Sequence, residues 1–90
     1  MNLGDWRVGL KWIKLEDLIG IPLDSKKGYT TQNKGNSNLQ ACSQEFEPLE
    51  NNGFIIKTDQ CFGYTKDSSN DYLWVKASNN TTVIVIQEGL

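Results

Sequence analysis

The last ten residues of the chain contain four consecutive β-branched apolar side chains, Val83, Ile84, Val85 and Ile86. A β-strand sends alternate side chains to opposite faces of its sheet, so a strand here is apolar on both faces. In a chain of 90 residues the second face needs a cover, which is either another part of the chain or another molecule. A strand of this kind without a cover would favour aggregation.

The segment 81–88 is preceded by a second strand-like segment at 71–77. Both are rich in β-branched and aromatic residues, which favour strands. Residues 78–80, Ser-Asn-Asn, suit a tight reversal because Asn tolerates the left-handed conformations of such turns. We therefore predict a C-terminal hairpin with apolar side chains on both faces.

Two registers are possible for this hairpin. A two-residue turn sets Val75 opposite Ile84, but it also sets Asp71 opposite Glu88, which is a pair of like charges. A three-residue turn sets Val75 opposite Val83 and avoids this repulsion. The second register is favoured.

The residues upstream predict more of an antiparallel sheet. Asn52-Gly53 lies between segments 46–49 and 54–57, and this dipeptide is a strong hairpin signal. Residues 54–64 form either two strands or one bent strand, and Gly63 indicates a bulge.

The first half of the chain is less regular. Alternating apolar residues predict a strand at its start: Trp6, Val8, Leu10 and Trp12. Residues 14–20 have apolar side chains at helical spacing and end in Gly20, which predicts a short helix with a glycine cap. Residues 24–40 are polar and predict a long loop or a flexible hairpin.

Together these patterns predict a single domain, residues 1–90, of the mainly β class. We expect a curved antiparallel sheet or a small barrel of five or six strands, with one short helix near residues 14–20. The alternative is an α+β fold in which residues 10–20 form a helix packed across an antiparallel sheet.

Charge and hydropathy exclude several classes of function. The chain has 11 acidic and 9 basic residues, and neither sign clusters. Nucleic-acid-binding proteins generally carry a basic stripe, so we expect no nucleic-acid partner. No stretch has the length of a transmembrane helix, and the N-terminus lacks the pattern of a secretion signal. We therefore expect no membrane association and a cytoplasmic location.

The absence of histidine bears most directly on catalysis. Without histidine there is no Ser-His-Asp or Cys-His arrangement and no common histidine-containing metal site. The two cysteines, Cys42 and Cys61, are too few for a four-thiolate zinc site, and we expect free thiols, with a disulfide as the alternative. Phosphate-binding glycine motifs are also missing. We expect no enzymatic activity, no cofactor and no metal.

The remaining signal is a surplus of aromatic and apolar surface for so small a chain, with three Trp, three Tyr and three Phe. The predicted binding residues are Trp6, Trp12, Tyr64, Tyr72, Trp74, Val83 and Val85.

We expect a small non-enzymatic protein-binding module, similar in kind to the inhibitors, immunity proteins and adaptors of bacteria and phages. It would act through an aromatic-rich sheet face or the 24–40 loop, and its partner would be another protein or a second copy of itself. The alternative is a small-ligand or carbohydrate-binding domain that uses aromatic stacking.

Overall fold

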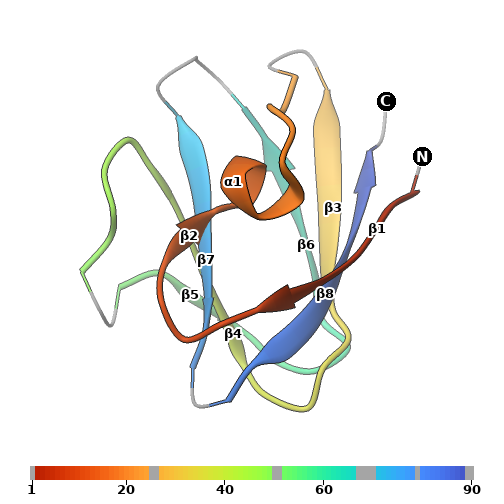
Figure 1. Cartoon of the computed structure of the whole chain (residues 1–90), viewed down its shortest axis with the longest axis vertical. Coiled ribbons are helices and arrows are strands. Elements are labelled where there is room, and N and C mark those ends of the chain that lie inside the picture. The colour runs from red at the N-terminus through yellow and green to blue at the C-terminus, as the bar shows by residue number, and fades with distance from the viewer. Residues whose placement is uncertain (1, 25–26, 50–51, 67–70, 79, 89–90) are drawn as a thin grey trace.

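The computed structural model describes residues 2–24, 27–49, 52–66, 71–78 and 80–88 (Figure 1). These residues form eight strands and one short helix. The strands are β1 (Asn2–Val8), β2 (Ile13–Lys14), β3 (Gly28–Asn33), β4 (Leu39–Gln44), β5 (Phe54–Ile56), β6 (Cys61–Thr65), β7 (Tyr72–Ala77) and β8 (Thr82–Glu88), and the helix is α1 (Leu15–Ile19).

The strands form two antiparallel four-stranded sheets. Sheet A has the order β1-β8-β3-β6 and sheet B has the order β2-β7-β4-β5. Along the chain the described strands alternate between the sheets, except that β4 and β5 are neighbours in sheet B. This interleaving of eight strands in two sheets is the jelly-roll arrangement. The mainly β prediction is confirmed, but the described strands number eight rather than five or six and form no closed barrel.

The predicted C-terminal hairpin is wrong, and so are both of its registers. β7 pairs with β2 and β4 in sheet B, whereas β8 pairs with β1 and β3 in sheet A. Val75 therefore lies opposite Ala41, and Ile84 lies opposite Trp6. The chain does reverse between the two strands, but in doing so it crosses from one sheet to the other. The predicted turn includes Asn79, which lies outside the described residues.

The core lies between the two sheets and takes alternate side chains from each strand. In β8, Ile84 and Ile86 are fully buried, whereas Val83 and Val85 lie on the outer face of sheet A and are half-buried. The apolar run is therefore covered by the core on one face. On the other face it is only partly covered, because its neighbours there are the side chains of the flanking strands.

The helix prediction is confirmed. α1 places Leu15 and Ile19 in the core, and Gly20 ends the helix with a φ of 79° while its N–H donates to the Glu16 carbonyl at 2.9 Å. Glycine adopts this left-handed conformation without a steric penalty. With only five residues, α1 does not form the long packed helix of the α+β alternative.

The outer face of sheet B is covered by the connection between β4 and β5. The Trp74 indole donates to the Gln44 carbonyl at 3.1 Å, and the Trp12 indole donates to the Leu49 carbonyl at 3.3 Å. Pro48 is buried, and the Trp74 side chain is only 9% exposed. This aromatic face is thus covered by the chain itself.

Several segment predictions need correction. Residues 46–49 form no strand but belong to the β4–β5 connection. Within the predicted polar loop 24–40, residues 28–33 form β3 and β4 begins at Leu39. Residues 54–64 form two strands, β5 and β6, which lie in different sheets, and the register of β3 with β6 is continuous at Gly63, so the predicted bulge is absent.

The predicted strand over residues 6–12 is correct only at its beginning. Trp6 and Val8 point inward from β1, but β1 ends at Val8 and Leu10 is 54% exposed. The chain turns after Val8 because it leaves sheet A there and enters sheet B at β2.

Candidate functional site

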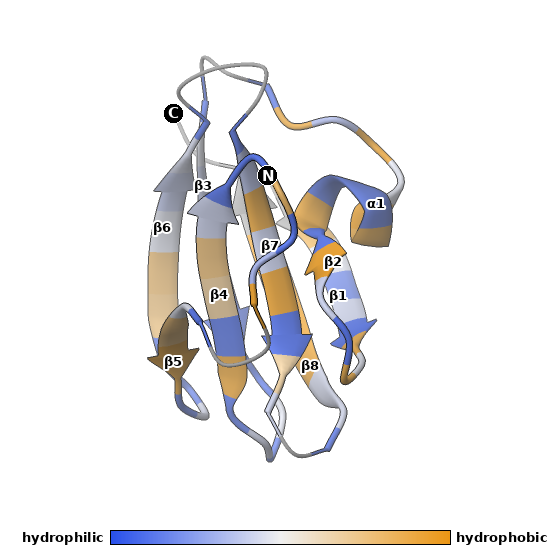
Figure 2. Cartoon of the chain, turned by 90° about the vertical axis from the view of Figure 1, so that its left-hand side faces the viewer, coloured by the Kyte–Doolittle hydropathy of each residue, from blue (hydrophilic) through white to orange (hydrophobic). Residues whose placement is uncertain are grey.

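The two sheets separate at one side of the molecule, where β5 and β6 are the edge strands. β5 pairs only with β4, and β6 pairs only with β3 among the described strands. Both edge strands lie on the same side of the sandwich, as Figure 2 shows. Between them is an open cleft of about 440 Å³, which we call the edge cleft.

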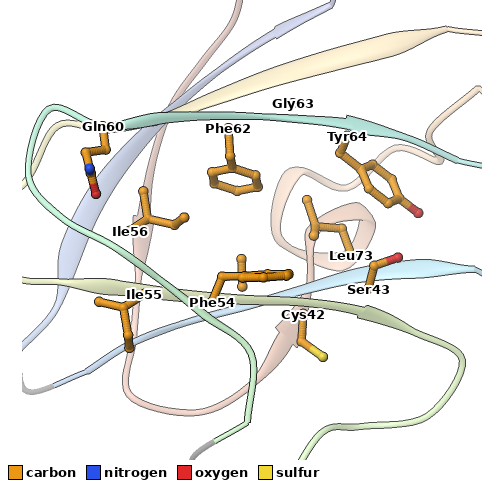
Figure 3. A pocket seen from close by; sticks show the side chains of 11 residues that line it. Cys42, Ser43, Phe54, Ile55, Ile56, Gln60, Phe62, Gly63, Tyr64 and Leu73 are labelled. Carbon is orange, nitrogen blue, oxygen red and sulfur yellow. The ribbon is translucent and has the colours of Figure 1, made fainter.

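Apolar side chains from both sheets line most of the edge cleft. They are Ala41, Phe54, Ile56, Phe62 and Leu73. In Figure 3, Phe62 extends from β6 toward Phe54 and Ile56 across the gap, whereas Ile55 and Cys42 point away from it. The polar lining residues include Ser43, Gln60 and Tyr64, and the described lining residues include no Asp, Glu, Lys or Arg. The cleft is therefore suited to neutral, apolar groups.

The local sequence explains how these side chains converge. Phe54 and Ile56 alternate on β5, and Phe62 and Tyr64 alternate on β6, so each pair points to the inner face of its sheet. Gly53 precedes β5 with a φ of 100°, and a Cβ there would lie 2.5 Å from the Ala41 carbonyl oxygen. Only glycine allows β5 to begin this close to β4.

Tyr64 has its hydroxyl at the end of the cleft near Asp71. The Tyr64 hydroxyl donates to the Asp71 backbone carbonyl at 3.1 Å, and the Ser43 hydroxyl donates to the Asp71 carboxylate at 2.6 Å. Burial raises the pKa of Tyr64 well above its ordinary value, and the negative charge of Asp71 raises it further. The hydroxyl therefore stays protonated at neutral pH and acts as a hydrogen-bond donor rather than as a base.

The surface around the cleft is unusually apolar. Phe54 is 76% exposed and Ile55 is 51% exposed. The β4–β5 connection carries two more exposed apolar residues, Phe46 and Leu49, each 75% exposed, but neither lines the cleft, and Leu49 lies beside Trp12. Among the described residues, four of the six large hydrophobic side chains that are exposed fall within residues 46–55. Apolar side chains exposed beside a cleft, as Phe54 and Ile55 are here, generally mark a contact site.

Of the predicted binding residues, only Tyr64 lines the edge cleft. Trp6 packs against the core from β1, at the opposite edge of sheet A, and its indole N–H is buried without a partner among the described residues. Trp12 lies in the turn before β2 and is held by its bond to the β4–β5 connection.

The other predicted residues lie on two outer faces. Tyr72 and Trp74 are on the outer face of sheet B, where two lysine ammonium groups lie 3.9 and 4.8 Å from the Tyr72 ring centre. Val83 and Val85 are on the outer face of sheet A. The structure therefore does not bring the predicted residues into one site.

The predicted binding residues do not include Phe54, Ile56, Phe62 or Leu73. The available signal was the alternation of apolar residues in two short neighbouring strands, which any half-buried sheet also shows. The pattern does not indicate that these strands form the edges of two different sheets.

Other chemistry has little support in the described part of the chain. No group of three or more His, Cys, Asp or Glu residues there is placed to hold a metal ion. Cys42 and Cys61 are both free, and Cys61 is exposed because it lies on the outer face of edge strand β6. No helix in the described residues is both long enough and apolar enough to cross a membrane.

Comparison with protein-family models, with curated proteins and with solved structures gives no significant match.

Proposed function

We propose that the chain is a small non-enzymatic binding module that receives an apolar segment of another protein in the edge cleft. The observation that supports this most directly is the exposure of Phe54 and Ile55 beside an uncharged cleft between two edge strands. An extended segment can pair with an edge strand through backbone hydrogen bonds while its side chains enter the adjacent cleft.

Two phenylalanine rings of the cleft, Phe54 and Phe62, would lose exposed surface when an apolar segment binds. Phe54 is largely exposed and Phe62 is half-buried, so the space between them leaves aromatic surface in water. An apolar side chain inserted between the rings removes this surface from water, at roughly 25 cal/mol for each Å². A charged side chain would lose its hydration there without a compensating partner.

The fold itself does not select the function, because jelly rolls occur in capsid, lectin and enzyme domains. The position of the site also differs from the sequence-based expectation. On the outer face of sheet B, Trp74 is almost completely covered and its indole donates to the Gln44 carbonyl, and much of segment 24–40 is strand. The exposed apolar surface lies instead at β5, so the proposed contact lies there.

A small apolar ligand is the second candidate, because a volume of about 440 Å³ is within the range of small-molecule sites. We favour an apolar ligand over a carbohydrate. Trp74 is almost completely covered and the cleft offers few polar groups, whereas sugar binding needs an exposed ring and many hydrogen bonds.

The experiment is selection of peptides from a random displayed library on the immobilised full chain. We expect the enriched peptides to carry alternating apolar residues. Phe54→Ser should weaken their binding about tenfold or more, as for an aromatic anchor at an interface. Phe46→Ser is the matched control, because Phe46 is equally exposed but does not line the cleft. It should leave binding unchanged.

Three outcomes would count against the protein-binding function. These are the absence of enriched peptides, binding that Phe54→Ser does not weaken, and binding that Phe46→Ser weakens equally. A parallel screen of apolar fragments by NMR tests the ligand alternative. Saturable shifts of Phe62 and Tyr64 with fragments, in the absence of peptide binding, would favour that alternative. Light scattering of the full chain shows whether a second copy occupies the cleft.

A further inference from the structure

Two lysines on the sheet B side are almost completely buried, and they differ in their partners. Lys66 and Lys76 are each only 6% exposed. Lys66 forms an ion pair with Glu16 and lies 4.8 Å from the Tyr72 ring centre. Lysine is rarely buried without such a partner, because its charge must be compensated.

Like Lys66, Lys76 lies near an aromatic ring, but among the described residues it has no carboxylate partner. Its ammonium nitrogen lies 5.5 Å from the centre of the Trp12 ring. Within the described part of the chain it has no ion-pair partner and no hydrogen-bond acceptor at bonding distance. The ring alone gives a weaker interaction than an ion pair with hydrogen bonds.

The side chain of Lys76 lines a pocket of about 320 Å³. This pocket lies between the turn that precedes β2 and the β4–β5 connection, and is distinct from the edge cleft. The other lining residues are Leu10, Lys11, Trp12, Glu47 and Pro48. A buried cation therefore contributes to the wall of an open pocket whose remaining surface is partly aromatic and apolar.

We propose that this pocket binds a carboxylate group attached to a small apolar or aromatic body. The carboxylate contacts the Lys76 ammonium, and the body packs against Trp12, Leu10 and Pro48. This site is separate from the edge cleft and does not depend on the function proposed for that cleft.

The charges around the pocket explain why a monocarboxylate fits better than a phosphate. Among the described lining residues, Lys11 and Glu47 are both exposed and opposite in sign, so Lys76 sets the net charge of this lining. A single ammonium group matches one negative charge, whereas phosphate recognition generally combines several cationic or backbone donors. The apolar walls also have no counterpart in a bare phosphate ion.

The test uses benzoate as the probe and NMR of the ¹⁵N-labelled full chain as the readout. The Trp12 indole signal, assigned with Trp12→Phe, should shift saturably with benzoate and should not shift with benzamide, which lacks the charge. Lys76→Met should weaken benzoate binding about tenfold or more, since a charge-assisted contact is lost. Lys57→Met is the matched control, because Lys57 is exposed and lines neither site, and it should bind normally.

A second variant keeps the test informative if Lys76→Met affects folding. Glu47→Gln removes the opposing charge from the pocket wall and should tighten benzoate binding about twofold to fivefold. N-acetylphenylalanine, which mimics a chain terminus, distinguishes a peptide carboxylate from a free acid by binding more tightly than benzoate.

The proposal is overturned if benzoate gives no saturable shift, if benzamide binds equally well, or if inorganic phosphate binds more tightly than benzoate. Unchanged benzoate binding by a folded Lys76→Met variant would also overturn it. None of these results bears on the edge cleft, so the two sites are tested separately.

Discussion

Replacement of Glu16 by glutamine tests the energetics of the buried ion pair on the sheet B side. The side chains of Lys66 and Glu16 are 8% and 16% exposed, so the variant leaves the Lys66 ammonium desolvated without a counter-charge. Removing one partner of a buried pair typically costs about 3–5 kcal/mol. Because Glu16 keeps some solvent access and the Tyr72 ring still contacts Lys66, we expect a loss of about 2–3 kcal/mol.

For a domain of this size that loss lowers the melting temperature by about 10–20 °C. The assay is thermal unfolding followed by circular dichroism, with urea unfolding as an independent measure. Glu16→Gln combined with Lys66→Met should recover most of the stability, because the variant leaves no unpaired charge at this position. Asp5→Asn is the control, since it breaks an exposed pair with Lys34 and should cost about 1 kcal/mol or less. A melting temperature of Glu16→Gln within about 2 °C of the parent protein would refute the reasoning.

Two further predictions concern the β8 strand and the cleft tyrosine. Ile84→Ala should lower the free energy of unfolding by about 3 kcal/mol and Val83→Ala by about 1 kcal/mol or less, because only Ile84 is fully buried. Equal losses in urea unfolding would show that the two faces of β8 are packed alike. Since the folded state raises the pKa of Tyr64, the unfolded chain loses this proton first, near pH 10, and stability should fall as the pH rises above that value. Tyr64→Phe should reduce this alkaline loss, and an identical pH profile for the variant would contradict the assignment.

The sequence predicted local structure better than strand pairing. The helix at 15–19 follows from apolar spacing and from Gly20, both of which act within a few residues. The pairing of β7 and β8 failed because a turn signal shows that the chain reverses but not whether both strands stay in one sheet. Crossing between sheets lets each strand bury one face in a common core and gain two hydrogen-bonded neighbours. In a C-terminal hairpin, β8 would have only one hydrogen-bonded neighbour, β7.

The polar strand β3 shows a second limit of the sequence pattern. Thr31 and Asn33 are fully buried, although their polarity favoured a loop. The Asn33 amide donates to the carbonyls of Ser37 and Ile56 at 2.8 and 3.0 Å and accepts from the Thr82 hydroxyl at 2.8 Å. A buried amide with these partners is compatible with a core. Two of these partners, Ile56 and Thr82, come from segments distant in the sequence, so residue type alone did not reveal them.

Two exposed apolar side chains of β5, Phe54 and Ile55, connect the fold with the proposed binding function. The β4–β5 connection is held to the outer side of sheet B by the bond from the Trp12 indole to the Leu49 carbonyl, but its side chains Phe46 and Leu49 stay exposed. Phe54 and Ile55 follow directly, at an edge strand that another chain can extend. Large exposed side chains at a sheet edge raise the risk of aggregation and contribute little to the stability of a monomer. The exposure of Phe54 and Ile55 beside a largely apolar cleft therefore favours contact with another molecule over a role in folding.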